Sequence, residues 1–330
     1  MVSHPADGRR PDFPGARERP AAYVGDMALP PSGTQWQLTS GGTEAVVVEA
    51  GGGLRTLTVG GVDVVAGYPR EAMASAGRGQ LLVPWPNRIR DGRYRFAGRD
   101  HELPITERST GNATHGLVRW ESFRPSEREE DRIVLGHTVH PRPGYPFALE
   151  VRVAWQVDPR GLTCSTTITN VGPDSAPVGY GAHPYLALGA TPAQQARLTV
   201  PADRVVLVDP DRKLPVGTHE VGDSPFDLRG GDVLGDRAID NAYTGLERGA
   251  DGCWTVTLEA DRTTRFWGGP GLDWVQVFTG RSTPAGPEGH APGIAVEPLS
   301  CPPDAFGSGE GLVTLGPGDS WTGQWGIEVG

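Results

Sequence analysis

Apolar and polar residues alternate along much of the chain from Gln35 onward. The clearest case is 147–157, where Phe, Leu, Val, Val, Trp and Val occupy every second position. The sequence Asp-Pro-Arg-Gly follows at 158–161, and apolar residues alternate again through 162–168. A period of two is typical of strands that bury one face, and Asp, Pro and Gly favour turns. This stretch therefore predicts a long β-hairpin.

A second hairpin is predicted at 54–65, where the dipeptide Gly60-Gly61 separates two short apolar runs. Only 71–76 has a weakly helical pattern. Further strand-like segments are expected at 133–139, 204–208, 254–258, 274–278, 293–297 and 312–315.

Composition supports the same fold class. The 330 residues include 48 Gly and 31 Pro, and the interiors of helices disfavour both residue types. No repeat of 34 to 45 residues is visible, which disfavours a propeller or a solenoid. We expect an all-β fold, a large antiparallel β-sandwich, as a single domain over 34–330. Residues 1–33 are rich in Pro, Arg, Gly and Ala, and we expect a disordered tail there.

Charge and motif content restrict the possible partners. Lys and Arg total 30 against 40 Asp and Glu, a formal net charge of −10, which disfavours nucleic acid. No apolar run is long enough to span a membrane, and the N-terminal segment lacks the apolar core of a signal peptide. Three cysteines form no complete disulfide set and show no metal-ligand spacing. We expect a cytoplasmic protein with no metal and no cofactor.

Asn87 and Arg88 follow the rigid sequence Pro84-Trp85-Pro86. Forked polar groups beside a flat aromatic ring suit a ligand with many hydroxyl groups. The alternative is that Arg88 forms an ordinary surface ion pair.

Two histidines stand beside residues that restrict the backbone. His115 precedes Gly116, although a lone loop histidine is more often just hydrogen-bonded. His183 follows a glycine-rich stretch and precedes Pro184-Tyr185. Because imidazole titrates near neutral pH, His183 is a candidate general acid or base.

Three further polar residues lie in or beside predicted strands. Asp240 precedes an asparagine, and the pair could simply form an Asx turn. Gln276 lies in an apolar strand. Glu297 follows Ile, Ala and Val, and it faces either solvent or the interior, where an unpaired carboxylate is costly.

Together and in this order, these segments resemble the aldose 1-epimerase (galactose mutarotase) family over about 35–330. The family folds as a large twisted β-sandwich, which agrees with the strand pattern. The matching motifs are Asn87-Arg88-Ile89, His115-Gly116, His183-Pro184-Tyr185, Asp240-Asn241, Gln276-x-Phe278-Thr279 and Glu297-Pro298.

The resemblance implies an isomerase that interconverts the α and β anomers of a free aldohexose by opening its ring. It implies that Glu297 takes the proton of the anomeric hydroxyl and that His183 protonates the ring oxygen. An Asp240 close to His183 would favour the imidazolium. The implied substrate-binding residues are Asn87, Arg88, His115, Asp240, Gln276 and Tyr185.

Departures from the family pattern leave the sugar open. Galactose enzymes of the family often have His-x-His-Gly-Gly, where this chain has Ala113 in place of the first His and Leu117 in place of the second Gly. Phe278 stands for the usual Tyr, and Leu299 for the usual Gln. Asn87-Arg88-Ile89 is similar to the free-sugar branch, whereas the arginine-rich loops also suit an anionic sugar, phosphorylated or sulfonated. The other alternative is a β-sandwich that binds carbohydrate without catalysing a reaction. The sequence does not distinguish a monomer from a dimer.

Overall fold

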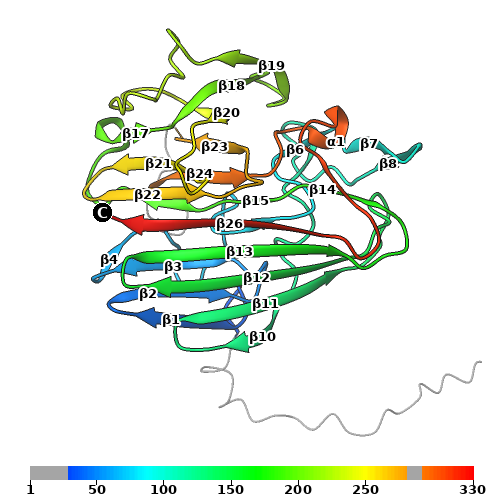
Figure 1. The fold of residues 1–330 in the computed structure, drawn as a ribbon, viewed down its shortest axis with the longest axis horizontal. Helices are drawn as coiled ribbons and strands as arrows, with labels where there is room; N and C mark the ends of the chain where they lie inside the picture. The colour runs from blue at the N-terminus through cyan, green and yellow to red at the C-terminus, as the bar shows by residue number, and fades with distance from the viewer. Residues whose placement is uncertain (1–28, 281–291) are drawn as a thin grey trace, which may run out of the picture.

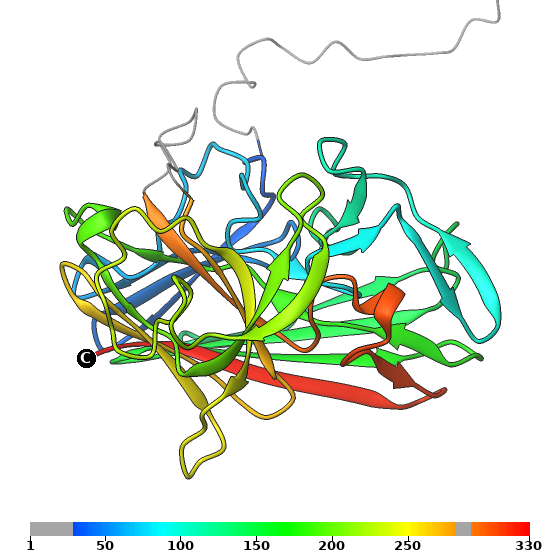
Figure 2. The same cartoon turned by 90° about the horizontal axis from the view of Figure 1, so that it is seen from above.

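The computed structural model describes residues 29–280 and 292–330, and within these the fold is almost entirely β (Figure 1). A short helix, α1 (Ala305–Ser308), is the α-helix found in the described residues. The sheets are antiparallel and stack as layers (Figure 2). The expected antiparallel β-sandwich is therefore confirmed.

The first sheet contains the longest strands and runs across the front of the molecule in Figure 1. In sheet order, its strands are β10 (Arg124–Arg128), β11 (Arg132–Val139), β12 (Leu149–Asp158), β13 (Gly161–Asn170), β26 (Ser320–Val329), β22 (Thr263–Gly268), β21 (Trp254–Glu259) and β17 (Arg197–Thr199).

The second large sheet holds four of the eight site residues predicted from the sequence, namely Tyr185, Asp240, Gln276 and Glu297. Its order is β19 (Pro215–Glu220), β18 (Ala202–Val208), β20 (Asp240–Leu246), β23 (Trp274–Phe278), β24 (Gly293–Leu299), β15 (Gly181–Ala182) and β5 (Leu81–Leu82), with β16 (Tyr185–Ala187) also paired to β24.

Smaller sheets complete the layers. The first of them has the order β1 (Gln35–Ser40), β2 (Thr43–Val48), β3 (Leu54–Val59) and β4 (Val62–Asp63). The two-stranded pairs are β6 (Arg88–Arg90) with β9 (Asn112–Thr114), β7 (Arg93–Phe96) with β8 (Arg99–Glu102), and β14 (Ala176–Val178) with β25 (Val313–Leu315).

The predicted hairpin at 147–168 is confirmed as β12 and β13, and its alternating apolar residues face the core. Trp155 is fully buried, packs edge-on against Trp325, and donates its indole N–H to the Gly52 carbonyl at 2.9 Å. That bond satisfies the one polar group of a large apolar side chain. It also ties the first sheet to the loop between β2 and β3.

The hairpin of β3 and β4 around Gly60-Gly61 is confirmed, and the other expected strands coincide with β11, β18, β21, β23, β24 and β25. The expected helix at 71–76 is wrong. This segment makes successive tight turns, in which Ala72 N–H donates to the Pro69 carbonyl and Arg78 N–H to the Ser75 carbonyl. Ala76 and Gly77 both have positive φ, which a right-handed helix does not allow.

The expected tail at 1–33 lies mostly outside the described residues, which begin at Leu29. Within 29–33 the chain is ordered against the sandwich: Ser32 is buried, and its carbonyl accepts a hydrogen bond from Ala50 N–H. No helix in the described part of the chain is both long and apolar enough to cross a membrane.

Candidate active site

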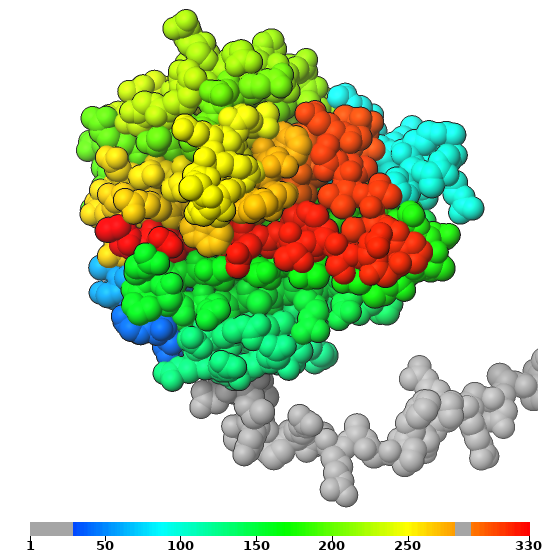
Figure 3. Space-filling model, in the orientation of Figure 1, coloured from blue at the N-terminus to red at the C-terminus, as the bar shows by residue number. Residues whose placement is uncertain are grey.

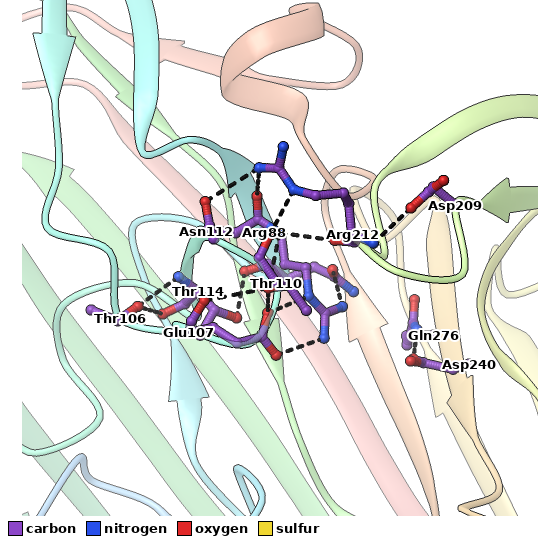
Figure 4. A network of polar contacts seen from close by, with 12 residues as sticks. Arg88, Thr106, Glu107, Thr110, Asn112, Thr114, Asp209, Arg212, Asp240 and Gln276 are labelled. Atoms are coloured by element: carbon purple, nitrogen blue, oxygen red, sulfur yellow. Dashed lines mark hydrogen bonds and ion pairs between the residues drawn. The ribbon is translucent and has the colours of Figure 1, made fainter.

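Three of the predicted polar residues lie side by side on β20, β23 and β24, which we call the strand wall. Gln276 of β23 is directly opposite Glu297 of β24 in the ladder. Gln276 donates its side-chain N–H to Asp240 Oδ1 at 2.8 Å, a contact drawn in Figure 4. Glu297 is 2 % exposed, so of its two possible orientations the interior one is correct.

His183 comes between β15 and β16, where its backbone is held on both sides. Its N–H donates to the Gln80 carbonyl at 3.0 Å, and its own carbonyl accepts from Gly79 N–H at 2.9 Å. The imidazole Nε2 lies 3.3 Å from Glu297 Oε1. The two residues that the resemblance implies as acid and base are therefore in direct contact.

Tyr185 lies behind His183. The two rings are stacked, with centroids 5.1 Å apart and planes 9° apart. The Tyr185 hydroxyl donates to the Ala76 carbonyl at 3.0 Å, and the Arg78 guanidinium covers the ring at 4.1 Å from its centroid. This geometry supports the imidazole rather than presenting the hydroxyl to a ligand.

Asn87, Arg88 and His115 lie on β6, β9 and their adjoining turns, which we call the loop wall. Asn87 has a φ of 52°, and its carbonyl accepts from His115 N–H at 2.8 Å. Arg88 forms a bidentate ion pair with Glu107, through Nε at 2.6 Å and Nη2 at 2.9 Å. The side chain is mostly buried, so Arg88 is part of a built site rather than of a surface ion pair.

The backbone around His115 is tightly constrained. His115 has a φ of 60°, and a Cβ atom on Gly116 would lie 2.2 Å from the Val83 carbonyl oxygen. Only glycine fits at position 116, where φ is also positive. As a result the His115 ring meets the His183 ring at 5.5 Å between centroids, nearly edge to face.

Burial shifts the pKa values of Glu297 and His183 in opposite directions. Burial, with the nearby Asp240 charge, raises the pKa of Glu297 well above its ordinary value, although Arg88 opposes the shift. Burial lowers the pKa of His183 to about 3, and the charges of Arg119, Arg78 and Arg88 act in the same direction. The imidazolium expected at His183 is disfavoured by burial and by the three arginines, while the Asp240 charge raises the pKa of Glu297.

The sequence did not single out Gly77, Glu107 and Arg119. Burial is the main cause of the lowered pKa of His115, and the nearby positive charge of Arg119 lowers this pKa further. Glu107 is recognisable only through its bond to Arg88. Gly77 is needed because a Cβ there would lie 2.5 Å from Cδ2 of His183. None of these residues lies in a distinctive motif.

Comparison with known proteins assigns the family. The family model described as aldose 1-epimerase matches residues 34–328. This chain belongs to the aldose 1-epimerase family. The family includes a relative in Escherichia coli K12, the uncharacterized protein YihR, that is 33 % identical over 289 residues, 87 % of this chain and 90 % of YihR.

Solved structures of low sequence identity share the aldose 1-epimerase fold. A GalM/aldose epimerase homologue from C. elegans has a TM-score of 0.79 at 17 % identity, covering 90 % of this chain and 98 % of that one. A putative aldose 1-epimerase from Escherichia coli K12 has a TM-score of 0.76 at 22 % identity, with coverages of 90 % and 99 %.

The contact between Gly77 and His183 can be tested with Gly77→Ala. The backbone strain of alanine at positive φ should destabilise the protein by about 1–2 kcal/mol, and the new methyl group should also displace the imidazole. Gly60→Ala is the matched control, because Gly60 has a φ of 62° and nothing within 4 Å of the added methyl. We expect a greater loss of stability in denaturant for Gly77→Ala, and a shifted His183 imidazole NMR signal for that variant alone. Equal losses with an unchanged His183 signal would contradict this packing.

Proposed function

We propose that this protein is a mutarotase that interconverts the α and β anomers of a free aldose. The observation that carries the proposal is the 3.3 Å contact between His183 Nε2 and Glu297 Oε1 in a buried, polar-lined position. A module that only binds carbohydrate does not need an imidazole and a carboxyl group in contact. The alternative of a non-catalytic sandwich is disfavoured for this reason.

Opening of the sugar ring requires two proton transfers. Glu297 as carboxylate takes the proton of the anomeric hydroxyl, the C1 carbonyl forms, and the bond from C1 to the ring oxygen breaks. His183 as imidazolium gives its proton to that ring oxygen. Rotation about C1–C2 then exposes the other face of the aldehyde, and closure reverses both transfers.

The pKa shifts of the pair favour the state that the opening step produces, in which the carboxyl group is protonated and the imidazole is neutral. A proton must therefore pass from Glu297 to His183 before a cyclic sugar can open. Their direct contact provides the route. Hydroxyl groups of the sugar bind to Asn87, Arg88, His115, Asp240 and Gln276 in this proposal.

Glu297→Gln and His183→Asn test the roles of the pair. Each variant removes one proton-transfer group, and we expect the anomer exchange rate to fall by roughly 10²–10⁴-fold. The rate is measured by exchange NMR on glucose, galactose and xylose, after the spontaneous rate has been subtracted. Circular dichroism shows whether each variant is folded. A folded variant with the full rate would refute its assigned role.

The pH profile tests the protonation state. With ordinary pKa values the pair would hold one proton only between about pH 4.3 and 6.5. Because the pKa of His183 is lowered to about 3 and that of Glu297 is raised, the one-proton state should extend down to about pH 3, and Glu297 should set its alkaline limit. We expect kcat to stay level from neutral pH down to about pH 4. Asp240→Asn should move the alkaline limb to lower pH, and a wild-type acid decline centred near pH 4.3 would contradict the assignment.

An anionic sugar is the second candidate substrate, because positive charge is in excess around the pair. The charges of Arg78, Arg88 and Arg119 all act on His183, and among the described residues Glu107 and Asp240 act on Arg88 in the opposite direction. No carboxylate among the described residues forms an ion pair with Arg78. An incoming phosphate or sulfonate would balance this charge.

Competition between neutral and anionic sugars decides between the two substrates. If the substrate is anionic, kcat/KM for a hexose 6-phosphate or 6-sulfonate should exceed that for glucose by at least about tenfold, and Arg78→Met should abolish the preference. Added salt should reduce the anionic kcat/KM and leave the neutral one unchanged. Equal kcat/KM values for the two classes would leave the neutral aldose as the substrate.

A further inference from the structure

Arg212 reaches from the turn between β18 and β19 to the loop that precedes β9. Its Nε donates to the Thr110 carbonyl at 2.7 Å, and its Nη2 donates to Asn112 Oδ1 at 3.2 Å. The Asn112 amide donates back to the Arg212 carbonyl at 2.9 Å (Figure 4). Asn112 is fully buried, so these reciprocal bonds satisfy polar groups that water does not reach.

The turn that carries Arg212 is itself well ordered by hydrogen bonds. Asp209 Oδ1 accepts from the backbone N–H groups of Asp211 at 3.0 Å and Arg212 at 2.6 Å. Lys213 N–H donates to the Asp209 carbonyl, and the adjoining Leu214 is buried. The guanidinium is therefore presented from a fixed backbone.

On one side, a chain of polar contacts leads from Arg212 to the loop wall. The Thr110 hydroxyl donates to Glu107, whose two carboxylate oxygens hold Arg88. Arg88 in turn donates to Asn87 Oδ1 at 3.2 Å. Arg212 thus supports the arginine and the asparagine that we propose to bind the sugar, without contacting the proposed site itself.

On the other side, Arg212 is connected to the strand wall through β18, which pairs with β20. Val205 of β18 is paired with Tyr243 of β20, and the Asn241 side chain donates to the Val206 carbonyl at 2.9 Å. Asp240 is the first residue of that same strand β20. The backbone of Arg212 is therefore linked to the strand wall, and its guanidinium group is linked to the loop wall.

We propose that Arg212 is a positioning residue that sets the distance between the strand wall and the loop wall, and thereby the affinity for the sugar. The ion pair of Arg212 with Asp91, at 2.7 Å, is exposed and adds little. The forked hydrogen bonds to Thr110 and Asn112 are the contacts that matter. The effect on sugar affinity rests on the proposed function, whereas the coupling of the two walls does not.

Arg212→Met tests the inference, with Arg229→Met as the matched control. Arg229 is likewise a partly exposed arginine. It forms ion pairs with Asp203 of β18 and with Asp227. In Arg212→Met we expect the amides of Gly111 and Asn112, which donate to the Glu107 carbonyl, to exchange with deuterium about tenfold faster. We also expect KM for the sugar to rise about tenfold, as for one lost hydrogen bond, with kcat changed by less than about threefold.

Arg212→Lys separates the hydrogen-bond fork from the charge. Lysine keeps the charge beside Asp91 but not the planar fork, so KM should stay raised. A wild-type KM in Arg212→Lys, unchanged amide exchange in Arg212→Met, or faster exchange without a change in KM would each overturn the proposal. If the wild-type protein exchanges no anomer of any sugar tested, the proposed function fails, and amide exchange alone then decides whether Arg212 couples the walls.

Discussion

The contact between the Glu297 carboxyl group and the His183 imidazole is the constraint on which the rest of the site depends. Both side chains are almost completely buried, and burial of two charged groups would be costly. Burial therefore raises the pKa of Glu297 and lowers that of His183, which favours the uncharged form of each group. The surrounding arginines and Asp240 adjust this balance without reversing it.

The fold builds the strand wall and the loop wall around this pair by two means that act at different ranges. The ladder of β20, β23 and β24 places Asp240, Gln276 and Glu297 on neighbouring strands, and its register leaves them little freedom. The loop wall depends instead on single residues in strained backbone conformations, such as Asn87 and His115. Strain of this kind is found where the surrounding structure fixes a functional geometry, and here Glu107 and Gly116 provide that support.

The sequence predicted the strands well, because a sheet with one buried face imposes a period of two on residues such as those of 147–157. It was misleading at 71–76, where successive turns with positive φ override a weak helical pattern. The resemblance singled out His183 and Glu297, but their 3.3 Å separation depends on pairing between strands distant in the chain. Arg119 and Gly77 could not be recognised, because their importance lies in what they touch rather than in their neighbours in the sequence.

The position of β26 has a consequence for how the chain folds. This strand, residues 320–329, lies in the middle of the first sheet, between β13 and β22. Until it is inserted, the hairpin of β12 and β13 has no partner on that side, and β21 and β22 cannot join the sheet. Such long-range pairing is slow to form, and the first sheet can be completed only once β26 has been synthesised and has left the ribosome.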